Sequence, residues 1–232
     1  MLSNYSIASN PELLKEIFHL EHVDPFDANY NVQPTQALPV ITSNRPDQSL
    51  NFHWGITSGF TKNKSVSEKL LYAPSAQLAT KATLRDGLMH KRCVILADGF
   101  YTWKNIAKKE AIPYRSCLPN NYPFAMAGIW NQYTNENDEA HHTFMIIRTE
   151  TKGPISEYTP VAPLILNEDL MVEWLNPSIQ DDSLLHFLGA CHHNDFTSYT
   201  VNPKLSDPKF NEASLWEKVP PANQFGNLTL FN

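Results

Sequence analysis

The stretch KRCVILADGFYTWK, residues 91–104, decides the fold of this chain. Its run of apolar and aromatic residues between charged ends predicts a strand over residues 93–104. Near the end of that strand, Thr102 stands between Tyr101 and Trp103. Threonine is a good strand former, so residue 102 is either an ordinary strand residue or one that stands in the place of a catalytic acid.

Three more strands follow in the sequence. Residues 112–118, 124–133 and 143–150 are strand-like, and the last two segments are apolar enough to be buried on both faces. The polar stretch TNENDEAHH between those two predicts a hairpin loop. Other extended segments are expected at NYNVQPTQALPVITS, LNFHWGI and the late strand SYTVNPKL.

Short helices are expected around these strands. In SNPELLKEIFHL, Asn10 is placed to cap a helix and Pro11 suits its first position. The segments ATLRDGLMH, EDLMVEWL and DSLLHFL predict three more helices, whereas residues 61–75 are polar and indicate a loop. Residues 218–232 indicate an irregular tail on the surface. Antiparallel strands with scattered short helices predict a single α+β domain over residues 1–232.

The composition fits a soluble protein with a sizeable core. Hydrophobic residues make up 42% of the chain, and no apolar run reaches the roughly 18 residues of a membrane span. The N-terminus lacks the basic and apolar regions of a signal peptide, so we expect a cytoplasmic monomer. The net charge is -6, from 18 basic and 24 acidic residues, which opposes strong non-specific binding to nucleic acid.

Residues 92–104 resemble the signature of the SOS-response-associated peptidase (SRAP) family, whose pattern is approximately RC-(apolar)-P-A-D-G-F-Y-E-W. Further segments match that family in order, namely YNVQPTQALPVI, WGI, LRDGLMHKRC, IPYRSCL, FAMAGIW, TFMIIRTET, PLILNEDLMVEWL and VNPKLSD. The resemblance covers most of the chain. It implies a distorted antiparallel β-barrel with short peripheral helices, within one α+β domain.

The resemblance also implies a chemistry. Members of this family process abasic sites in DNA and belong to the SOS and DNA damage responses. Their Cys at position 2, exposed after removal of Met, attacks the aldehyde of the ring-opened sugar and forms a thiazolidine crosslink to single-stranded DNA. A Glu, a His and an Asn support proton transfer and position the sugar. The same Cys is proposed to release a short pro-peptide.

All four of these family positions carry a different residue in this chain. The nucleophile position is Leu2, which has no thiol, and the Glu position is Thr102. Aligning Pro163 with the family's Pro places Thr159 at the His, and Tyr72 falls at the Asn. Threonine does not ionise usefully near neutral pH, so neither Thr acts as a general acid or base. The sequence therefore predicts a chain without the family's catalytic residues.

The candidate nucleic-acid contacts are Asn31, Trp54 and Arg85. Trp54 is a possible stacking platform, a contact worth ~1–3 kcal/mol per base, or alternatively a packing residue. Arg85 corresponds to a family DNA contact or alternatively forms a surface salt bridge. Three other family arginines are absent, at Asn4, Pro74 and Val161. These losses predict weak binding to single-stranded DNA at most.

The segment ACHHND, residues 190–195, is the one other constellation of polar groups. Its Cys191, His192, His193 and Asp195 are adjacent in sequence, and their spacing is not that of zinc sites. The chain has three cysteines, Cys93, Cys117 and Cys191. An odd number without paired spacing does not indicate a disulfide framework. We expect no metal and no cofactor.

Three hypotheses follow. The first is a catalytically degenerate family member, a pseudoenzyme with weak DNA binding or an unknown protein partner. The second is an active abasic-site protein whose Met1 α-amine forms a Schiff base, because an amine with a pKa of about 7.7–8 is partly unprotonated at neutral pH. Leu2 is expected to block removal of Met1. The third is a protein that uses the groove for a ligand other than nucleic acid.

Overall fold

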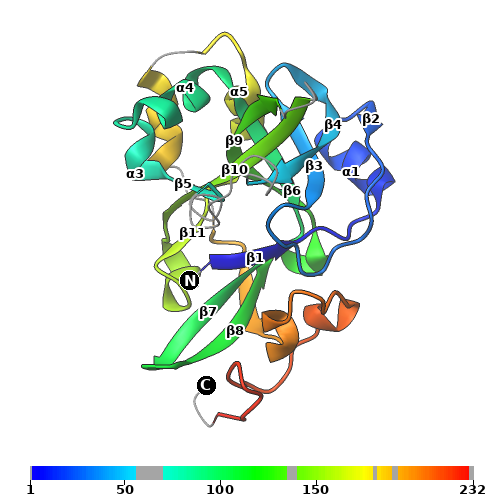
Figure 1. Ribbon diagram of the computed structural model, residues 1–232, viewed down its shortest axis with the longest axis vertical. Coiled ribbons are helices and arrows are strands. Elements are labelled where there is room, and N and C mark those ends of the chain that lie inside the picture. Colours follow the sequence, from blue (N-terminus) through cyan, green and yellow to red (C-terminus); the bar gives the residue numbers. More distant parts are fainter. Residues whose placement is uncertain (1, 56–69, 135–139, 180–181, 190–192, 230–232) are drawn as a thin grey trace.

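The computed structural model describes residues 2–55, 70–134, 140–179, 182–189 and 193–229. A closed barrel at its centre consists of β3 (Ala37–Thr42), β4 (Arg45–Trp54), β6 (Arg92–Ala97), β9 (Phe124–Thr134) and β10 (Ala140–Glu150) (Figure 1). Neighbouring strands pair antiparallel, except that β10 runs parallel to β4 where the barrel closes. The expected α+β barrel fold is confirmed, with this parallel junction as a mixed element.

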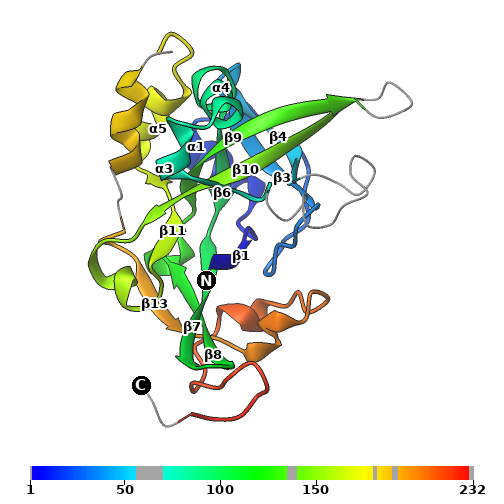
Figure 2. The ribbon, with the colours of Figure 1, turned by 60° about the vertical axis from the view of Figure 1, so that its left-hand side comes forward.

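A second sheet of four strands stands below the barrel in Figure 1. Its strands are, in spatial order, β1 (Leu2–Ser6), β7 (Gly99–Ala107), β8 (Glu110–Cys117) and β13 (Thr197–Thr200). All of these neighbours pair antiparallel. The β7–β8 hairpin extends away from the barrel in both ribbon views (Figures 1 and 2). The chain thus builds two sheets that meet near β1.

Short helices pack around the barrel and the second sheet. The α-helices are α1 (Pro11–Phe18), α3 (Ser75–Leu78), α4 (Ala82–His90) and α5 (Glu168–Leu175). The 3-10 helices are η1 (Pro119–Asn121), η2 (Gly153–Glu157), η3 (Asp182–Gly189), η4 (Pro203–Ser206) and η5 (Ala213–Trp216). Helix α1 begins as predicted, since the Asn10 side chain accepts a hydrogen bond from the Glu12 amide. The predicted helix DSLLHFL is the 3-10 helix η3.

Four short strands extend the barrel sheet: β2 (His22–Val23), β5 (Tyr72–Pro74), β11 (Val161–Pro163) and β12 (Ile165–Leu166). Strand β5 corrects the expectation of a loop over residues 61–75, because it pairs parallel with β10. Residues 61–69 lie outside the described residues. So short a strand carries no periodicity, and its pairing with a distant strand leaves no mark in the local sequence.

The stretch predicted as one strand, 93–104, is two strands in different sheets. The chain leaves the barrel at the fully buried Asp98, between β6 and β7. The Asp98 carboxylate accepts hydrogen bonds of 2.6 Å from the Ser6 hydroxyl and from the Ala8 amide. Arg115 on β8 donates to the Asp98 carbonyl at 2.9 Å, and its guanidinium lies 3.9 Å from the carboxylate. Asp98 and Arg115 therefore join β1, β7 and β8 to the barrel.

Arg92, at the start of β6, is a buried cation that caps the C-terminal ends of two helices. Its guanidinium donates to the carbonyls of Leu88 and Met89 in α4, and to those of Trp174 and Asn176 at the end of α5. These carbonyls belong to helix ends, where the last C=O groups lack helical partners. Arg92 therefore stabilises both helices against the barrel, and its place in the RC pair of the stretch is structural.

The tail lies across the β7–β8 hairpin. Residues 218–229 form no regular element apart from an isolated bridge between Ala222 and Leu228. The Gln224 amide donates to the Ala111 carbonyl at 3.1 Å, and the Ala111 amide donates to the Gln224 side chain at 2.8 Å. The described part of the tail is therefore irregular but attached. No helix in the described residues is long and apolar enough to span a membrane.

Replacing Asp98 tests the junction. Asp98→Ala leaves the Arg115 charge buried without its carboxylate, and we expect the free energy of unfolding to fall by about 3–5 kcal/mol in urea denaturation. Asp98→Asn retains an oxygen acceptor and should lose less. The exposed control Asp27→Ala should change the stability by no more than about 0.5 kcal/mol. Equal effects of Asp98→Ala and Asp27→Ala would contradict this account.

Candidate functional site

Two of the four positions that the resemblance assigns to catalysis pair directly on the second sheet, and a third follows in the chain a residue that packs against this sheet. The backbone of Leu2 pairs with that of Thr102 on β7, and Thr102 pairs in turn with Tyr114 on β8. The Tyr114 and Tyr158 rings are in contact, with centroids 4.6 Å apart. Thr159 follows Tyr158 directly in the chain. The second sheet therefore pairs positions 2 and 102, and position 159 follows a residue whose ring packs against this sheet.

Tyr72, the fourth position, lies on the barrel side and is linked to the second sheet through two other aromatic rings. Its ring packs edge-on against Trp54 at 5.6 Å between centroids, and Trp54 packs edge-on against Tyr5 at 5.4 Å. Tyr5 pairs with Phe100 on β7, so this aromatic chain ends on the second sheet. The Arg148 guanidinium lies over the Tyr72 ring, 5.4 Å from its centroid. Tyr72 thus connects the site to the cationic side chain of Arg148.

The side chains at this site offer little acid–base chemistry. Thr102 is fully buried, and its hydroxyl has no hydrogen-bond partner among the described residues. The Thr159 hydroxyl donates to the Val161 carbonyl at 2.7 Å. Burial raises the pKa of Tyr5 well above its usual range and also raises that of Tyr72, although Arg148 opposes the shift at Tyr72. None of these described side chains ionises near neutral pH, so none is a general acid or base there.

The structure places two of the candidate nucleic-acid contacts in buried positions. Trp54 is fully buried and its indole donates to the Leu71 carbonyl at 3.1 Å, so it presents no ring face to a base. Asn31 is 1% exposed. Its amide nitrogen lies 3.0–3.3 Å from three carbonyl oxygens, those of Leu205, Asp207 and Phe210. Both residues therefore serve packing and chain connection, which the motif match alone does not distinguish from ligand binding.

Arg85, the third candidate, is on the surface. Its guanidinium donates to the Asp182 carboxylate at 2.6 Å, and its side chain is 42% exposed. This contact matches the salt-bridge alternative. An exposed pair contributes little to stability, so a phosphate can compete with Asp182 for Arg85.

The ACHHND segment supplies no metal site among the described residues. His193 is buried, and its Nε2 lies 2.9 Å from the Pro163 carbonyl oxygen. Cys191 and His192 lie outside the described residues. Cys93 and Cys117 are free and buried, and burial raises the pKa of the Cys93 thiol well above its usual range. Within the described ranges, no three His, Cys, Asp or Glu side chains come close enough to hold an ion.

A cleft of about 680 Å³ opens beside Tyr72, and its polar lining was not predicted from the sequence. We name it the Tyr72–Arg148 cleft; its polar lining includes Tyr72, Gln77, Lys81, Asn131, Tyr133 and Arg148. None of the described residues that line it carries a carboxylate. Lys81 precedes α4 and Arg148 lies on β10, so the two cations line one cleft although they are far apart in the sequence. No local motif in the sequence predicts that Lys81 and Arg148 line one cleft.

The closed barrel with a second sheet at its mouth defines a class of known folds. A protein from Bacteroides thetaiotaomicron has a crystal structure with a TM-score of 0.76 and 22% identity, covering 93% of this chain and 99% of that chain. A protein from Bordetella bronchiseptica gives a TM-score of 0.70 and 19% identity, covering 86% and 99%. At these identities the likeness shows the fold alone.

The sequence comparisons give the family. Abasic site processing protein YoqW of Bacillus subtilis (strain 168) is 29% identical over 222 residues, covering 94% of this chain and 99% of YoqW. Abasic site processing protein YoaM of the same organism is 31% identical over 192 residues, covering 82% and 85%. The family model for SOS response associated peptidase (SRAP) matches residues 1–208. This chain therefore belongs to the SRAP family.

The buried Thr102 hydroxyl yields a test of its role. Because it lacks a partner, Thr102→Val removes a desolvated polar group without changing the shape, and we expect the free energy of unfolding to rise by about 1 kcal/mol. The matched variant Thr159→Val breaks a hydrogen bond and should lower it by a similar amount. Urea denaturation measures both. A clear loss of stability in Thr102→Val would mean that its hydroxyl has a partner in solution.

Proposed function

We propose that this chain is a SRAP-family protein that does not crosslink to DNA and that binds single-stranded DNA weakly. The observation that carries this proposal is the pairing of Leu2 with Thr102. It pairs a leucine and a buried threonine, which are the residues at the positions that the family resemblance gives to the nucleophile and the acid. A thiazolidine needs an amine and a thiol on one residue, and Leu2 has no thiol. The names of the relatives support an abasic site as the lesion concerned.

The Tyr72–Arg148 cleft supports single-stranded DNA as the ligand. Lys81 and Arg148 attract backbone phosphates, and Tyr72 and Tyr133 offer aromatic groups that bases contact without sequence preference. The overall charge of -6 opposes the approach of a polyanion. Because only these two cations line the described part of the cleft, and the chain has a net negative charge, we expect binding to be weak and to depend strongly on salt.

Fluorescence anisotropy with a labelled oligonucleotide tests this binding. Each cation that neutralises a phosphate adds about −0.7 to the slope of log K against log salt for a single strand, so Arg148→Ala should weaken binding and flatten the slope by about 0.7. Arg45→Ala removes an exposed arginine on β4, away from the cleft, and should leave the slope unchanged. Tight binding that persists at high salt, or equal effects of the two variants, would contradict the proposal.

The covalent chemistry is tested with single-stranded DNA that carries one abasic site. We expect no heat-stable adduct on a denaturing gel, because neither the thiol nor the acid–base groups are present. A peptide with an N-terminal cysteine serves as the positive control for a reactive aldehyde. A band that appears only with borohydride would replace the proposal by the Schiff-base alternative. A band that survives heating without reductant would refute it.

A further inference from the structure

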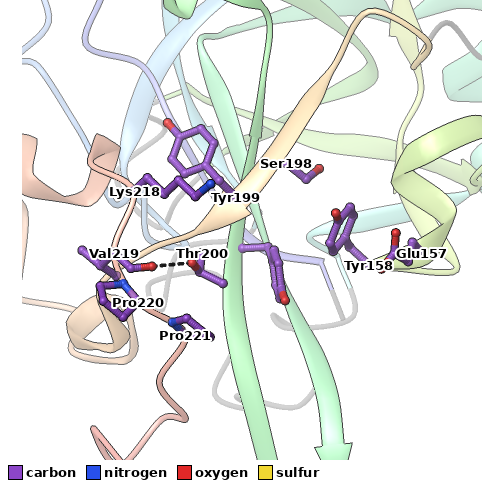
Figure 3. A pocket seen from close by; sticks show the side chains of 10 residues that line it. Glu157, Tyr158, Ser198, Tyr199, Thr200, Lys218, Val219, Pro220 and Pro221 are labelled. Carbon is purple, nitrogen blue, oxygen red and sulfur yellow. Dashed lines mark hydrogen bonds between the residues drawn. The ribbon is translucent and has the colours of Figure 1, made fainter. Parts of the chain in front are cut away.

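A second cleft, of about 600 Å³, lies between η2, the edge of the second sheet and the tail (Figure 3). We name it the tail cleft; one wall includes Tyr114, Glu157 and Tyr158, and the other includes Lys218 and Val219. The family match ends at residue 208. The wall formed by the tail therefore lies outside the region that this chain shares with the family model.

Hydrogen bonds fix the tail wall in place. The Val219 amide donates to the Thr200 carbonyl at 3.0 Å, and the Thr200 hydroxyl donates back to the Val219 carbonyl (Figure 3). Further along, the Gln224 side chain donates to the Lys109 carbonyl at 2.6 Å. A wall held at several points needs little further ordering when a ligand binds, which favours binding.

The tail cleft adjoins the family site. Tyr114 pairs with Thr102 on one side and with Thr200 on the other, so one row of residues crosses from the site into the cleft. Tyr158 contacts Tyr114 and directly precedes Thr159. A ligand that extends past positions 102 and 159 on this side therefore enters the tail cleft.

The lining combines an aromatic ring, an acceptor and a cation. Tyr158 is partly exposed, and Lys104 lies 5.2 Å from its ring centroid and 3.2 Å from the Glu157 carboxylate. Lys218 is exposed on the opposite wall, and no ion pair to it occurs within the described residues. An aromatic surface accepts a base, a carboxylate accepts from an exocyclic amino group, and a lysine attracts phosphate.

We propose that the tail cleft binds a nucleotide that flanks the family site, with its base against Tyr158 and its phosphate at Lys218. This inference rests on the proposed binding of single-stranded DNA. Glu157 makes the cleft prefer a base that carries an amino group, so cytosine binds better than thymine. The tail thereby adds a selective subsite to a site that has lost its crosslinking residues.

Anisotropy with labelled oligo-dC and oligo-dT of equal length tests this subsite. We expect the wild type to bind oligo-dC more tightly, and Glu157→Gln to reduce that preference without weakening oligo-dT. Tyr158→Ala should weaken both oligonucleotides about fivefold, the low end of a base–aromatic contact. Lys218→Ala should flatten the salt slope by about 0.7, whereas the exposed control Lys209→Ala should not.

The outcomes separate the two proposals. If the wild type binds and Arg148→Ala weakens binding, but Tyr158→Ala and Lys218→Ala bind like the wild type, the tail-cleft proposal is overturned and the proposed function stands. If the wild type binds neither oligonucleotide, both proposals fall. Equal urea midpoints for all variants establish that a loss of binding is not a loss of folding.

Discussion

The buried junction of Asp98 with Arg115 is the constraint on which the rest of this structure depends. At Asp98 the chain must leave the barrel and begin the second sheet. The Asp98 carboxylate accepts hydrogen bonds from the Ser6 hydroxyl, at the end of β1, and from the Ala8 amide just after it. Gly99 has to be a glycine, because a Cβ would lie 2.6 Å from the Arg115 Nε. Arg115 also lies over the Trp216 ring, 4.6 Å from its centroid, close to the start of the tail. One ion pair thus links the barrel, β1 and the approach to the tail.

The residues that stabilise the fold are different from those at the positions that the family resemblance gives to catalysis. Asp98, Arg115 and Arg92 are buried and hold backbone groups, so replacing any of them would disturb the fold. Thr102 and Thr159 occupy positions that the family resemblance gives to catalysis. A threonine suits a strand or a turn there, but it is not a general acid or base near neutral pH. Residues at such a site can change while the fold persists, because function lives in side chains placed on a fold rather than in the fold itself. Membership of the SRAP family is therefore compatible with the proposed absence of crosslinking.

Local chemistry made part of this structure predictable from the sequence. The start of α1 follows from Asn10 and Pro11, and the apolar strands of the barrel follow from their composition. The break at Asp98 was not predicted, because a buried residue within an apolar run gives no sign that the strand changes sheets. The burial of Trp54 and the presence of Lys81 and Arg148 in one cleft depend on packing between segments distant in the sequence, which a single sequence does not display. The four substituted positions came from the family resemblance, and the fold pairs two of them, Leu2 and Thr102.

The central claim is that this scaffold lacks the side chains for crosslinking, and the yield of heat-stable adduct across a variant series measures this most directly. The series compares the wild type, Leu2→Cys, and Leu2→Cys combined with Tyr72→Asn, Thr102→Glu and Thr159→His, each checked for folding by its urea midpoint and for removal of Met1 by mass. On abasic single-stranded DNA, the account predicts no adduct from the wild type, little from Leu2→Cys and most from the combined variant. An adduct from the wild type as abundant as that from the combined variant would contradict it.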